Sequence, residues 1–350
     1  MTQDFKINNF DLLRIFAATQ VLFNHSYKHL HIPYPIWYNV IASFPGVTMF
    51  FVMSGFLISA SLERNPDLKN YFTNRALRIY PALWFVVLLS IATIWIAADI
   101  SFINRETIPW MICQFIGFIY TPAFLSHYGF GSYNGSLWTI PLELQFYLVL
   151  PIIYYFSTLI TSNSRQKTII LTIVFTIFCL LAYYILEHYT RINLKLETKF
   201  QKILRYTFIP HIYMFLAGVV LQRIKAYNSV FIYGKGILWI LSYLLFCYFV
   251  PASNLTVIIR NLFLAVTLIS VAYSLPGVAH KLLRGNDISY GVYIYHGLVL
   301  SVLVHMGLTG NSYYVFLILI ITYILSFLSW RFIEKPFLGR KRKTIHAVAL

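Results

Sequence analysis

Charged residues are scarce in this chain: Asp, Glu, Lys and Arg together make up 11% of its 350 residues. Soluble domains carry about 25% charged residues on average. Hydrophobic residues account for 59%, and the mean hydropathy is +0.70. A soluble fold of this length cannot bury that much apolar surface. The composition therefore excludes a soluble protein and indicates that the lipid bilayer surrounds most of the chain.

Acidic residues are the rarer charged kind, with 11 Asp and Glu against 27 Lys and Arg, which gives a formal net charge of +16. In a soluble protein this excess would indicate nucleic-acid binding. Here the basic residues lie mostly in short loops between apolar runs, as the positive-inside rule describes. We therefore expect membrane lipids, and no nucleic acid, as partners.

Cysteine is also rare. Cys113, Cys179 and Cys247 lie in or beside apolar stretches and show neither a paired pattern nor a metal-ligand spacing. No metal site is expected. The first ten residues are polar and Arg14 enters the first apolar segment, so no cleavable signal peptide is expected either.

Apolar segments of the length that crosses a bilayer recur along the whole chain. We predict about ten transmembrane helices in an all-α, polytopic membrane protein. The predicted spans are 11–30, 39–62, 79–99, 138–158, 168–188, 206–224, 237–252, 254–275, 288–306 and 313–333. The apolar stretch 109–124 is short, so we expect it at the membrane interface or as a re-entrant segment.

The distribution of Lys and Arg predicts the orientation of these spans. Most Lys and Arg residues fall in the segments on the same side of the membrane as the N-terminus. By the positive-inside rule, this side is the cytoplasm, and both termini lie there. The basic outer loop 189–205 runs against this rule. No internal repeat or flexible linker is visible. We expect one membrane domain, 1–337, followed by a basic cytoplasmic tail, 338–350.

Ionisable residues inside the predicted spans are the first functional candidates, because burying them in hydrocarbon is costly. Arg14 and His25 are eleven residues apart, just over three helical turns, and so share one helix face. At 1.5 Å rise per residue, Arg14 lies about 5 Å and His25 about 20 Å from the inner edge. The alternative for His25 is a structural histidine bonded to a neighbouring helix.

The segment NGSLWTIPLE (134–143) offers a second ionisable group at similar depth. The span runs inward, so Trp138 lies at the outer interface and Glu143 about 8 Å below it. A carboxylate and an imidazole at one depth can act as a base and its orienting partner. We expect Pro141 to free a backbone carbonyl nearby and to open a cavity.

Paired arginines mark the inner threshold of the third span. Arg75 and Arg78 are spaced i, i+3 in NRALRIYP (74–81), and Pro81 follows where a helix can bend. Two arginines in this arrangement can hold a phosphate or pyrophosphate group. Anchoring of the membrane topology is the equal alternative.

Two further segments place small or hydroxyl side chains at membrane depth. Ser54 lies in PGVTMFFVMSGFLIS (45–59), a segment whose small residues also permit close helix packing. Ser289, Tyr293 and His296 follow i, i+4, i+7 on one face of the ninth predicted span. These side chains are expected either to line a cavity or to pack.

These motifs, in this order, resemble the acyltransferase-3 family of bacterial membrane acyltransferases over residues 9–337. The segments that carry the resemblance are FDLLRIFAATQVLFNH (10–25), GVTMFFVMSGFLI (46–58), NRALRIYP (74–81), WTIPLELQFY (138–147), SYGVYIYH (289–296) and EKP (334–336). The ordered set is specific, although no single motif is. Two departures stand out: Thr48 replaces the family's Asp after Gly-Val, and Thr139 replaces its common Ser.

The resemblance implies transfer of an acyl group, most often acetyl, from cytoplasmic acyl-CoA to a hydroxyl of a cell-surface glycan or its lipid-linked precursor. It places the enzyme in the bacterial cytoplasmic membrane. No extra soluble domain is expected after residue 350, which makes this a stand-alone form, and the oligomeric state is left open, with a homo-oligomer as one alternative. On this reading His25 is the general base or a transient acyl carrier, and Glu143 orients it. Arg14, Arg75 and Arg78 contact the donor, and the residues lining the cavity are Ser54, Trp138, Ser289, Tyr293 and His296.

Two other classes of protein are compatible with buried polar residues. A transporter, such as a flippase of lipid-linked sugar or an exporter of organic anions, also carries His, Arg and Glu at mid-membrane. A structural or signalling subunit would tolerate their replacement by apolar residues. Transfer of radiolabel from acyl-CoA to an acceptor distinguishes the enzyme from both.

Overall fold

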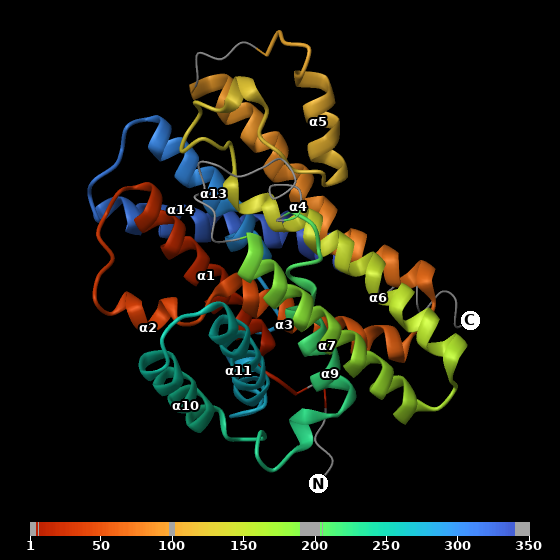
Figure 1. The fold of residues 1–350 in the computed structure, drawn as a ribbon. Coiled ribbons are helices and arrows are strands. Elements are labelled where there is room, and N and C mark those ends of the chain that lie inside the picture. The colour runs from red at the N-terminus through yellow and green to blue at the C-terminus, as the bar shows by residue number, and fades with distance from the viewer. Residues whose placement is uncertain (1–4, 6, 98–101, 190–203, 205, 340–350) are drawn as a thin grey trace. The chain divides into compact units, whose positions relative to one another are not determined.

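The computed structural model describes residue 5 and residues 7–97, 102–189, 204 and 206–339, and this part is helical and contains no β-strand (Figure 1). The α-helices are α1 (Phe10–His29), α2 (Tyr38–Ala42), α3 (Gly46–Arg64), α4 (Leu68–Ala97), α5 (Thr107–Ile116), α6 (Ile140–Ile160), α7 (Ser164–Tyr189), α9 (Ile212–Arg223), α10 (Gly236–Phe249), α11 (Asn254–Ala272), α12 (Val278–Leu283), α13 (Ser289–His305) and α14 (Tyr313–Ser329). Short 3₁₀ turns are η1 (Ala123–Leu125), η2 (Gly135–Thr139) and η4 (Ala226–Asn228), and a π-helical turn, η5 (Trp330–Glu334), extends α14.

Six helical segments among the described residues are long and apolar enough to cross a membrane. They are Tyr38–Arg64, Leu68–Ile96, Gly135–Ile160, Ser164–Glu187, Asn254–Ala272 and Tyr313–Gly339. These segments confirm an all-helical, multi-pass membrane protein. The count of ten spans and the orientation of the termini stay predictions.

The other four predicted spans are too short or too polar to qualify by length and composition. Helix α9 has 12 residues, α10 has 14 and α13 has 17, while α1 has 20 but carries Asp11, Arg14 and Lys28. Burial explains α13, since every residue from Ser289 to Ser301 is buried by protein. A helix enclosed by other helices does not need to match the bilayer by itself. Most of the basic loop 189–205 and of the tail 338–350 lies outside the described residues.

Helix α7 shows the opposite environment. Only 17% of its apolar segment is buried, and Ile169, Ile173 and Ile177 follow one another at i, i+4 on an exposed stripe. Exposing such an apolar stripe to water is unfavourable, whereas lipid tails solvate it. The first part of the stretch 109–124 belongs to helix α5, which has ten residues and is too short to cross a bilayer. Its expected place at the membrane interface or as a re-entrant segment stays a prediction.

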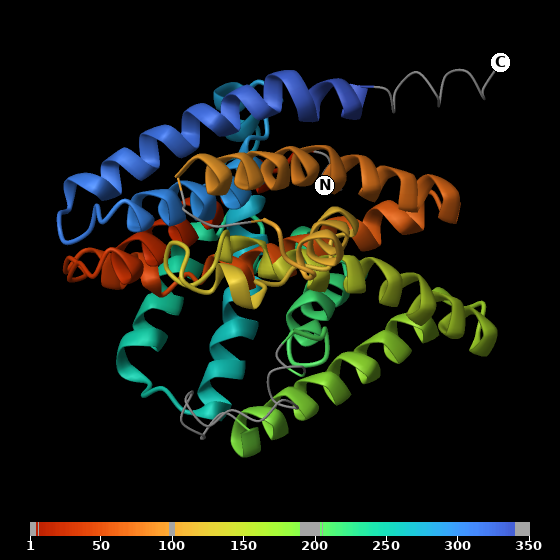
Figure 2. The same cartoon turned by 90° about the horizontal axis from the view of Figure 1, so that it is seen from above.

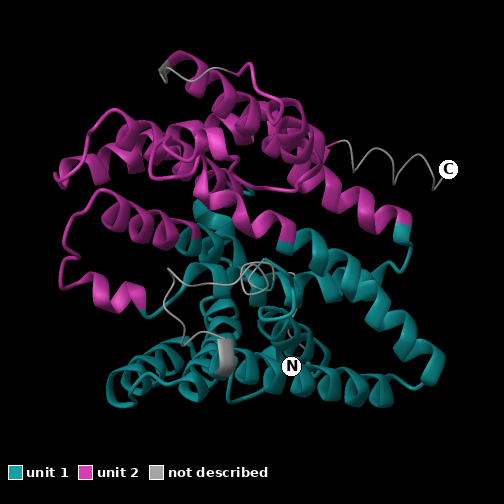
Figure 3. Ribbon diagram, turned by 45° about the horizontal axis from the view of Figure 1, so that its top comes forward, with its two compact units in different colours: residues 1–17, 43–68, 142–285 teal, residues 18–42, 69–141, 286–350 magenta. Residues whose placement is uncertain are grey.

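The chain divides into two compact units, which Figure 3 distinguishes by colour. Unit 1 comprises residues 1–17, 43–68 and 142–285, and unit 2 comprises 18–42, 69–141 and 286–350.

Unit 1 is built around the packing of α3 on α9. Gly55 and Gly218 form the crossing point: a Cβ at Gly55 would lie 1.9 Å from the carbonyl oxygen of Phe215, and one at Gly218 would lie 2.1 Å from that of Val52. Only glycine permits this approach at both positions. The close packing that the small residues of the α3 segment indicate is therefore confirmed. Helices α10 and α11 form an adjacent pair in the same unit (Figure 2).

An ionic cluster joins four helices of unit 1, and we define it by Glu63 (α3), Tyr154 (α6), Ser164 (α7) and Arg223 (α9). Arg223 forms an ion pair with Glu63 and donates a 3.0 Å hydrogen bond to the Ser164 carbonyl. The hydroxyl of Tyr154 donates to the same Glu63 carboxylate at 2.8 Å. The cluster thereby ties the ends of these helices together.

Unit 2 is organised around the buried helix α13, against which both α14 and the η2 turn pack. The hydroxyl of Tyr290, in the first turn of α13, donates a 3.1 Å hydrogen bond to the Ile79 carbonyl of α4. Tyr295 donates a 3.0 Å bond to Ser329 on α14. Buried hydroxyls on α13 are thus hydrogen-bonded to two neighbouring helices, α4 and α14.

Candidate active site

The structure joins two histidines that the sequence places in different motifs. Nδ1 of His25, on α1, lies 3.0 Å from Nε2 of His296, on α13. Both belong to unit 2. His296 is fully buried, whereas His25 is half-buried. Because His296 occupies Nδ1 of His25, the atom of this pair left for contact with a substrate is Nε2 of His25.

His296 is held from its own helix as well. Its Nδ1 lies 3.1 Å from the backbone carbonyl of Val292, one turn earlier. The two ring nitrogens of His296 are therefore both engaged, one by the backbone and one by His25. This ring is fixed within the core, and it was expected from the sequence only as a cavity-lining residue.

The η2 turn packs against α13 at the residue that follows His296. Nδ2 of Asn134 donates a 2.9 Å hydrogen bond to the Ile294 carbonyl, and Oδ1 of Asn134 accepts one from the Ser136 hydroxyl at 2.6 Å. A Cβ at Gly297 would lie 2.2 Å from Asn134 Oδ1 and 2.7 Å from Ser136 Oγ. The glycine thus lets the turn sit directly on α13. Sequence analysis missed this role of Asn134, although the residue stands in a motif already singled out.

The loop before η2 is anchored in turn. Burial raises the pKa of the Tyr133 phenol, so it stays protonated and donates a 2.5 Å hydrogen bond to Oε1 of Gln114 on α5. The indole of Trp110, also on α5, donates to the Tyr120 carbonyl at 3.1 Å. The short helix α5 therefore supports the segment that carries Asn134.

Thr139 and Tyr293 meet at the end of η2. Their hydroxyls lie 2.8 Å apart and both residues are buried. Thr139, where the family's common residue is Ser, keeps a hydroxyl that has a defined partner. Trp138, half-buried, belongs to the same 3₁₀ turn, so the regular helix begins at Ile140.

Pro141 is the second residue of α6 and directly follows η2, where the 3₁₀ turn becomes a regular α-helix. The helical segment Gly135–Ile160 runs continuously across it. The cavity expected at Pro141 stays a prediction. Pro81 likewise lies inside a continuous helix, α4.

Arg78 is engaged by an acidic residue of its own unit. Its Nη2 lies 2.6 Å from Oδ2 of Asp287, and the two side chains are 23% and 11% exposed. Oδ1 of Asp287 accepts a 3.1 Å hydrogen bond from the Ser289 amide and a second bond from the Ser289 hydroxyl. Asp287 thus links α4 to the start of α13. Ser289 contributes to this junction, and sequence analysis overlooked Asp287.

Arg75 lies one turn before Arg78 on α4 and is half-buried. Its guanidinium carbon lies 5.7 Å from the ring centroid of Tyr71. The helix starts at Leu68, eleven residues before the apolar run of the predicted span. Both arginines therefore lie on a continuous helix, and not on a loop that precedes it.

Three of the predicted residues belong to unit 1. Arg14, on the first turns of α1, forms a 3.0 Å ion pair with Asp11. Glu143, on α6, accepts a hydrogen bond from the hydroxyl of Tyr147 one turn later. Ser54 is half-buried on α3 beside the glycine crossing. The predicted pairing of Glu143 with His25 stays a prediction, whereas His25 is hydrogen-bonded to His296.

A second buried carboxylate, besides Asp287, was absent from the predicted site. Glu334, in the π-helical turn η5, is only 2% exposed and accepts a 3.2 Å hydrogen bond from Ser329. It lies within electrostatic reach of Arg78 and Asp287. Its signal in the sequence was a carboxylate at the end of an apolar run, together with the rarity of acidic residues.

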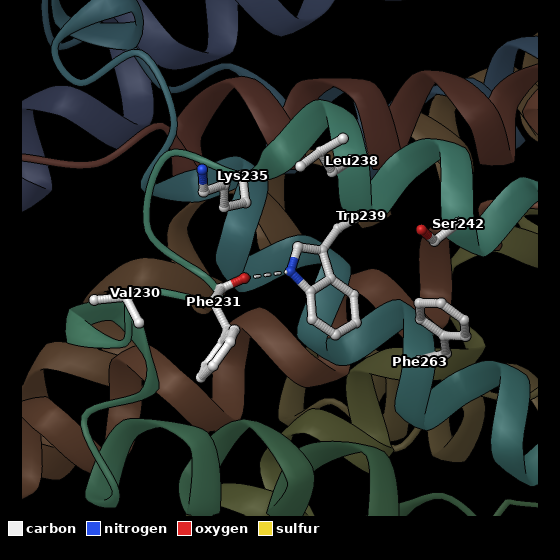
Figure 4. Close-up of a pocket in the computed structure, with 7 residues that line it drawn as sticks. All are labelled: Val230, Phe231, Lys235, Leu238, Trp239, Ser242 and Phe263. Carbon is white, nitrogen blue, oxygen red and sulfur yellow. Dashed lines mark hydrogen bonds between the residues drawn. The ribbon is translucent and has the colours of Figure 1, made fainter.

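A groove in unit 1 is separate from the set of predicted residues. Figure 4 shows the indole of Trp239, which donates a 2.8 Å hydrogen bond to the Phe231 carbonyl, beside the ring of Phe263. The lining residues are Val230, Phe231, Lys235, Leu238, Trp239, Ser242 and Phe263. None of them is a residue singled out from the sequence, so this groove does not enter the site.

The chemistry available in unit 2 is that of an oriented imidazole. A half-buried histidine with one ring nitrogen bonded to a fixed partner can accept a proton or form a covalent adduct at the other nitrogen. Within the described residues, no three His, Cys, Asp or Glu side chains gather as a metal site requires.

Comparison with known proteins assigns the class. A family model described as "Acyltransferase domain" (acyltransferase-3) matches residues 7–331. The chain therefore belongs to the acyltransferase-3 family, and it is an O-acyltransferase. This confirms the resemblance drawn from the ordered motifs.

Several curated proteins are similar to this chain. Nodulation protein 10 of Rhizobium leguminosarum bv. viciae is 31% identical over 94% of this chain and 92% of its own length. The O-acetyl transferase of Shigella phage Sf6 is 30% identical over 96% of this chain and 97% of its own. The peptidoglycan O-acetyltransferase OatA of Listeria monocytogenes is 25% identical over 84% of this chain and 51% of its own. No solved structure matches.

Proposed function

We propose that this enzyme transfers an acyl group, and specifically acetyl, from acyl-CoA to a hydroxyl of a cell-surface polysaccharide or its lipid-linked precursor. The observation that carries the proposal is the hydrogen-bonded pair of His25 and His296, which leaves Nε2 of His25 for a substrate. Relatives named O-acetyltransferases support acetyl as the group and oxygen as the acceptor atom. The family assignment favours an enzyme over a transporter or a structural subunit.

In the proposed reaction His25 acts as the general base. Nε2 takes the proton of the acceptor hydroxyl while its oxygen attacks the thioester carbonyl. The carbon–sulfur bond breaks, the CoA thiolate leaves, and the proton on Nε2 passes to that sulfur. The products are the O-acyl glycan and CoA with a free thiol. No proton is gained or lost overall.

The donor's phosphates require cationic partners, and α4 supplies two in the unit that holds the histidine pair. Arg78 is already bonded to Asp287, so its contribution to phosphate binding is shared with a structural role. Arg75, one turn away on the same helix, is the second donor contact in this proposal. Arg14 is a further donor contact in this proposal, with Asp11 as its present partner.

The acceptor is proposed to be a polysaccharide because relatives are named peptidoglycan O-acetyltransferases. We place the enzyme in the bacterial cytoplasmic membrane, with the donor entering from the cytoplasm. This direction rests on the predicted topology, in which basic residues are concentrated inside. Glu143 is proposed to assist His25, while Ser54, Trp138 and Tyr293 contribute to the substrate cavity. A homo-oligomer is compatible with the proposal and is not needed for it.

A transfer assay tests the proposal. Purified protein in lipid nanodiscs receives acetyl-CoA labelled in the acetyl group together with isolated cell-wall or lipopolysaccharide glycan. We expect label on the glycan, and we expect His25→Ala to lower the rate by about 100-fold or more, as loss of a general base does. His280→Ala, at an exposed histidine on α12, is the matched control and should retain the rate. Wild-type activity of His25→Ala would remove the histidine from the mechanism.

A second assay tests the donor site. Arg75→Ala is expected to weaken acetyl-CoA binding and to reduce its dependence on salt, because one charge contact with phosphate is lost. Lys69→Ala, near the start of the same helix, serves as the control for general surface charge. An unchanged affinity and salt dependence for Arg75→Ala would make this arginine a topology anchor.

A further inference from the structure

We propose that His296 is a positioning residue, which fixes the tautomer of His25 so that His25 presents an unprotonated Nε2 to the substrate. The inference rests on the proposed function, because it assumes that His25 performs the chemistry. It adds a role for a second histidine that touches neither donor nor acceptor.

The backbone of α13 determines which ring nitrogen of His296 carries the proton. Its Nδ1 lies 3.1 Å from the carbonyl oxygen of Val292. A carbonyl oxygen can only accept a hydrogen bond, so Nδ1 must carry the proton and donate it. The backbone of α13 therefore determines which nitrogen of His296 is protonated.

Burial determines the charge of the His296 ring. His296 is 0% exposed, and all residues from Ser289 to Ser301 around it on α13 are buried. An imidazolium at this position would lose its hydration without gaining an anionic partner on the bonds that the ring makes, to a carbonyl and to another imidazole. The ring is therefore neutral. With Nδ1 protonated, Nε2 of His296 carries a lone pair and can only accept.

The lone pair on Nε2 of His296 determines the tautomer of His25. Nε2 of His296 lies 3.0 Å from Nδ1 of His25, and an acceptor at that distance requires a donor opposite. Nδ1 of His25 must therefore carry a proton. A neutral His25 then has its lone pair on Nε2, which is the atom that a general base or an acyl carrier uses.

The same bond serves the reaction as it proceeds. When Nε2 of His25 takes the hydroxyl proton, the ring becomes an imidazolium, and its Nδ1–H donates a stronger, charge-assisted hydrogen bond to His296. When Nε2 delivers that proton to the leaving thiolate, the neutral tautomer returns with Nδ1 still protonated. His296 thus acts as the carboxylate does in a Ser-His-Asp triad, holding the tautomer without reacting itself.

The surroundings keep the geometry of this pair constant. The Asn134 amide bonds to the carbonyl of Ile294, and the η2 turn rests on Gly297, so α13 is held on both sides of His296. A shift of the ring would break a bond at each of its nitrogens. The site therefore has a positioned partner for His25 on a rigid, buried helix.

Two substitutions at His296 separate positioning from packing. In His296→Gln the amide nitrogen can donate to Val292 and Oε1 can accept from His25, which preserves the polarity of both bonds. In His296→Leu neither bond survives. We expect His296→Leu to lower kcat by about 100-fold while KM for acetyl-CoA and for glycan changes by less than about threefold, and His296→Gln to restore kcat to within about tenfold of wild type. Tyr295→Phe, which removes one buried hydroxyl from the same helix, is the matched control and should keep wild-type kcat.

Nitrogen NMR of the wild-type protein gives a readout that does not depend on any variant at His296. Protein labelled with ¹⁵N-histidine is measured in nanodiscs, and His25→Gln identifies the His25 signals by their loss. We expect Nδ1 of His25 to show the shift of a protonated nitrogen, and Nε2 that of an unprotonated one. In His296→Leu we expect the opposite tautomer of His25 to become populated.

The outcomes distinguish the inference from the proposed function. If His25→Ala is inactive while His296→Leu keeps wild-type kcat, the positioning role is wrong and the proposed function stands. A protonated Nε2 on His25 in the wild-type protein also overturns the positioning role. If His25→Ala itself retains full activity, the proposed function fails and the inference fails with it. If His296→Leu does not fold, the NMR tautomer of the wild type and the activity of His296→Gln decide the question.

Discussion

Substitution of Gly297 by alanine tests the packing that holds the histidine pair. In an ordinary helix interior this change stabilises the protein by about 0.5–1 kcal/mol, because glycine is the poorer helix former. In α13 the added methyl would lie 2.2 Å from Oδ1 of Asn134 and 2.7 Å from Oγ of Ser136. The amide cannot simply swing away, since it bonds to the Ile294 carbonyl at 2.9 Å and accepts from Ser136 at 2.6 Å.

The expected loss of stability in Gly297→Ala follows from these contacts. Overpacking a tight site costs about 1–3 kcal/mol, and displacing the amide loses one or two hydrogen bonds worth about 1 kcal/mol each. After subtraction of the helix-propensity gain, we expect Gly297→Ala to lower the free energy of unfolding by about 1–4 kcal/mol. At about 2 °C per kcal/mol for a chain of this size, Tm falls by about 2–8 °C.

The chain supplies its own probe for the assay. Cys113, Cys179 and Cys247 are free and half-buried, so a thiol-reactive dye reports their exposure on heating in detergent. The double variant Asn134→Ala/Gly297→Ala should cost less than the sum of the single changes, because the obstructing amide is gone. A Gly297→Ala protein as stable as wild type, or more stable, would refute the close contact between η2 and α13.

Three further predictions concern other parts of the molecule. Gly55→Ala should lower Tm by several degrees, because the methyl meets a backbone carbonyl of α9 at 1.9 Å and neither backbone can move freely. Thr139→Val should lower the rate of acetyl transfer several-fold, since the buried Tyr293 hydroxyl loses its 2.8 Å partner, whereas Thr139→Ser should keep it. Arg223→Met should cost about 1–2 kcal/mol in thermal unfolding, a moderate loss because the Glu63 side chain is 29% exposed and water can replace part of the ion pair.

Much of the helical architecture is predictable from apolar runs. The predicted spans 168–188, 254–275 and 313–333 correspond closely to Ser164–Tyr189, Asn254–Ala272 and Tyr313–Ser329. Hydropathy predicts these helices because they face lipid or a largely apolar core. It predicts helix ends less well, as α4 shows: its polar first turns are helical but lie before the apolar run.

The site could be predicted as a set of residues but not as a set of contacts. The spacing of Arg14 and His25 on one helix face follows from helical periodicity, and α1 is indeed continuous over both. Which side chain of another helix meets His25 depends on how helices pack, and periodicity contains no such information. His296 was therefore named without its partner, and Asp287 was missed because its importance depends on the distant Arg78.

Acyl transfer to a surface glycan by a histidine of unit 2 is tested most directly in the cell. Surface polysaccharide is isolated from bacteria that lack the gene, carry it, or carry the His25→Ala form at equal protein level, and its mass is measured. We expect sugars heavier by one acetyl group in the bacteria that carry the wild-type gene, and unmodified sugars in the other two strains. Equal modification with wild-type and His25→Ala genes, or no difference in glycan mass with and without the gene, would contradict it.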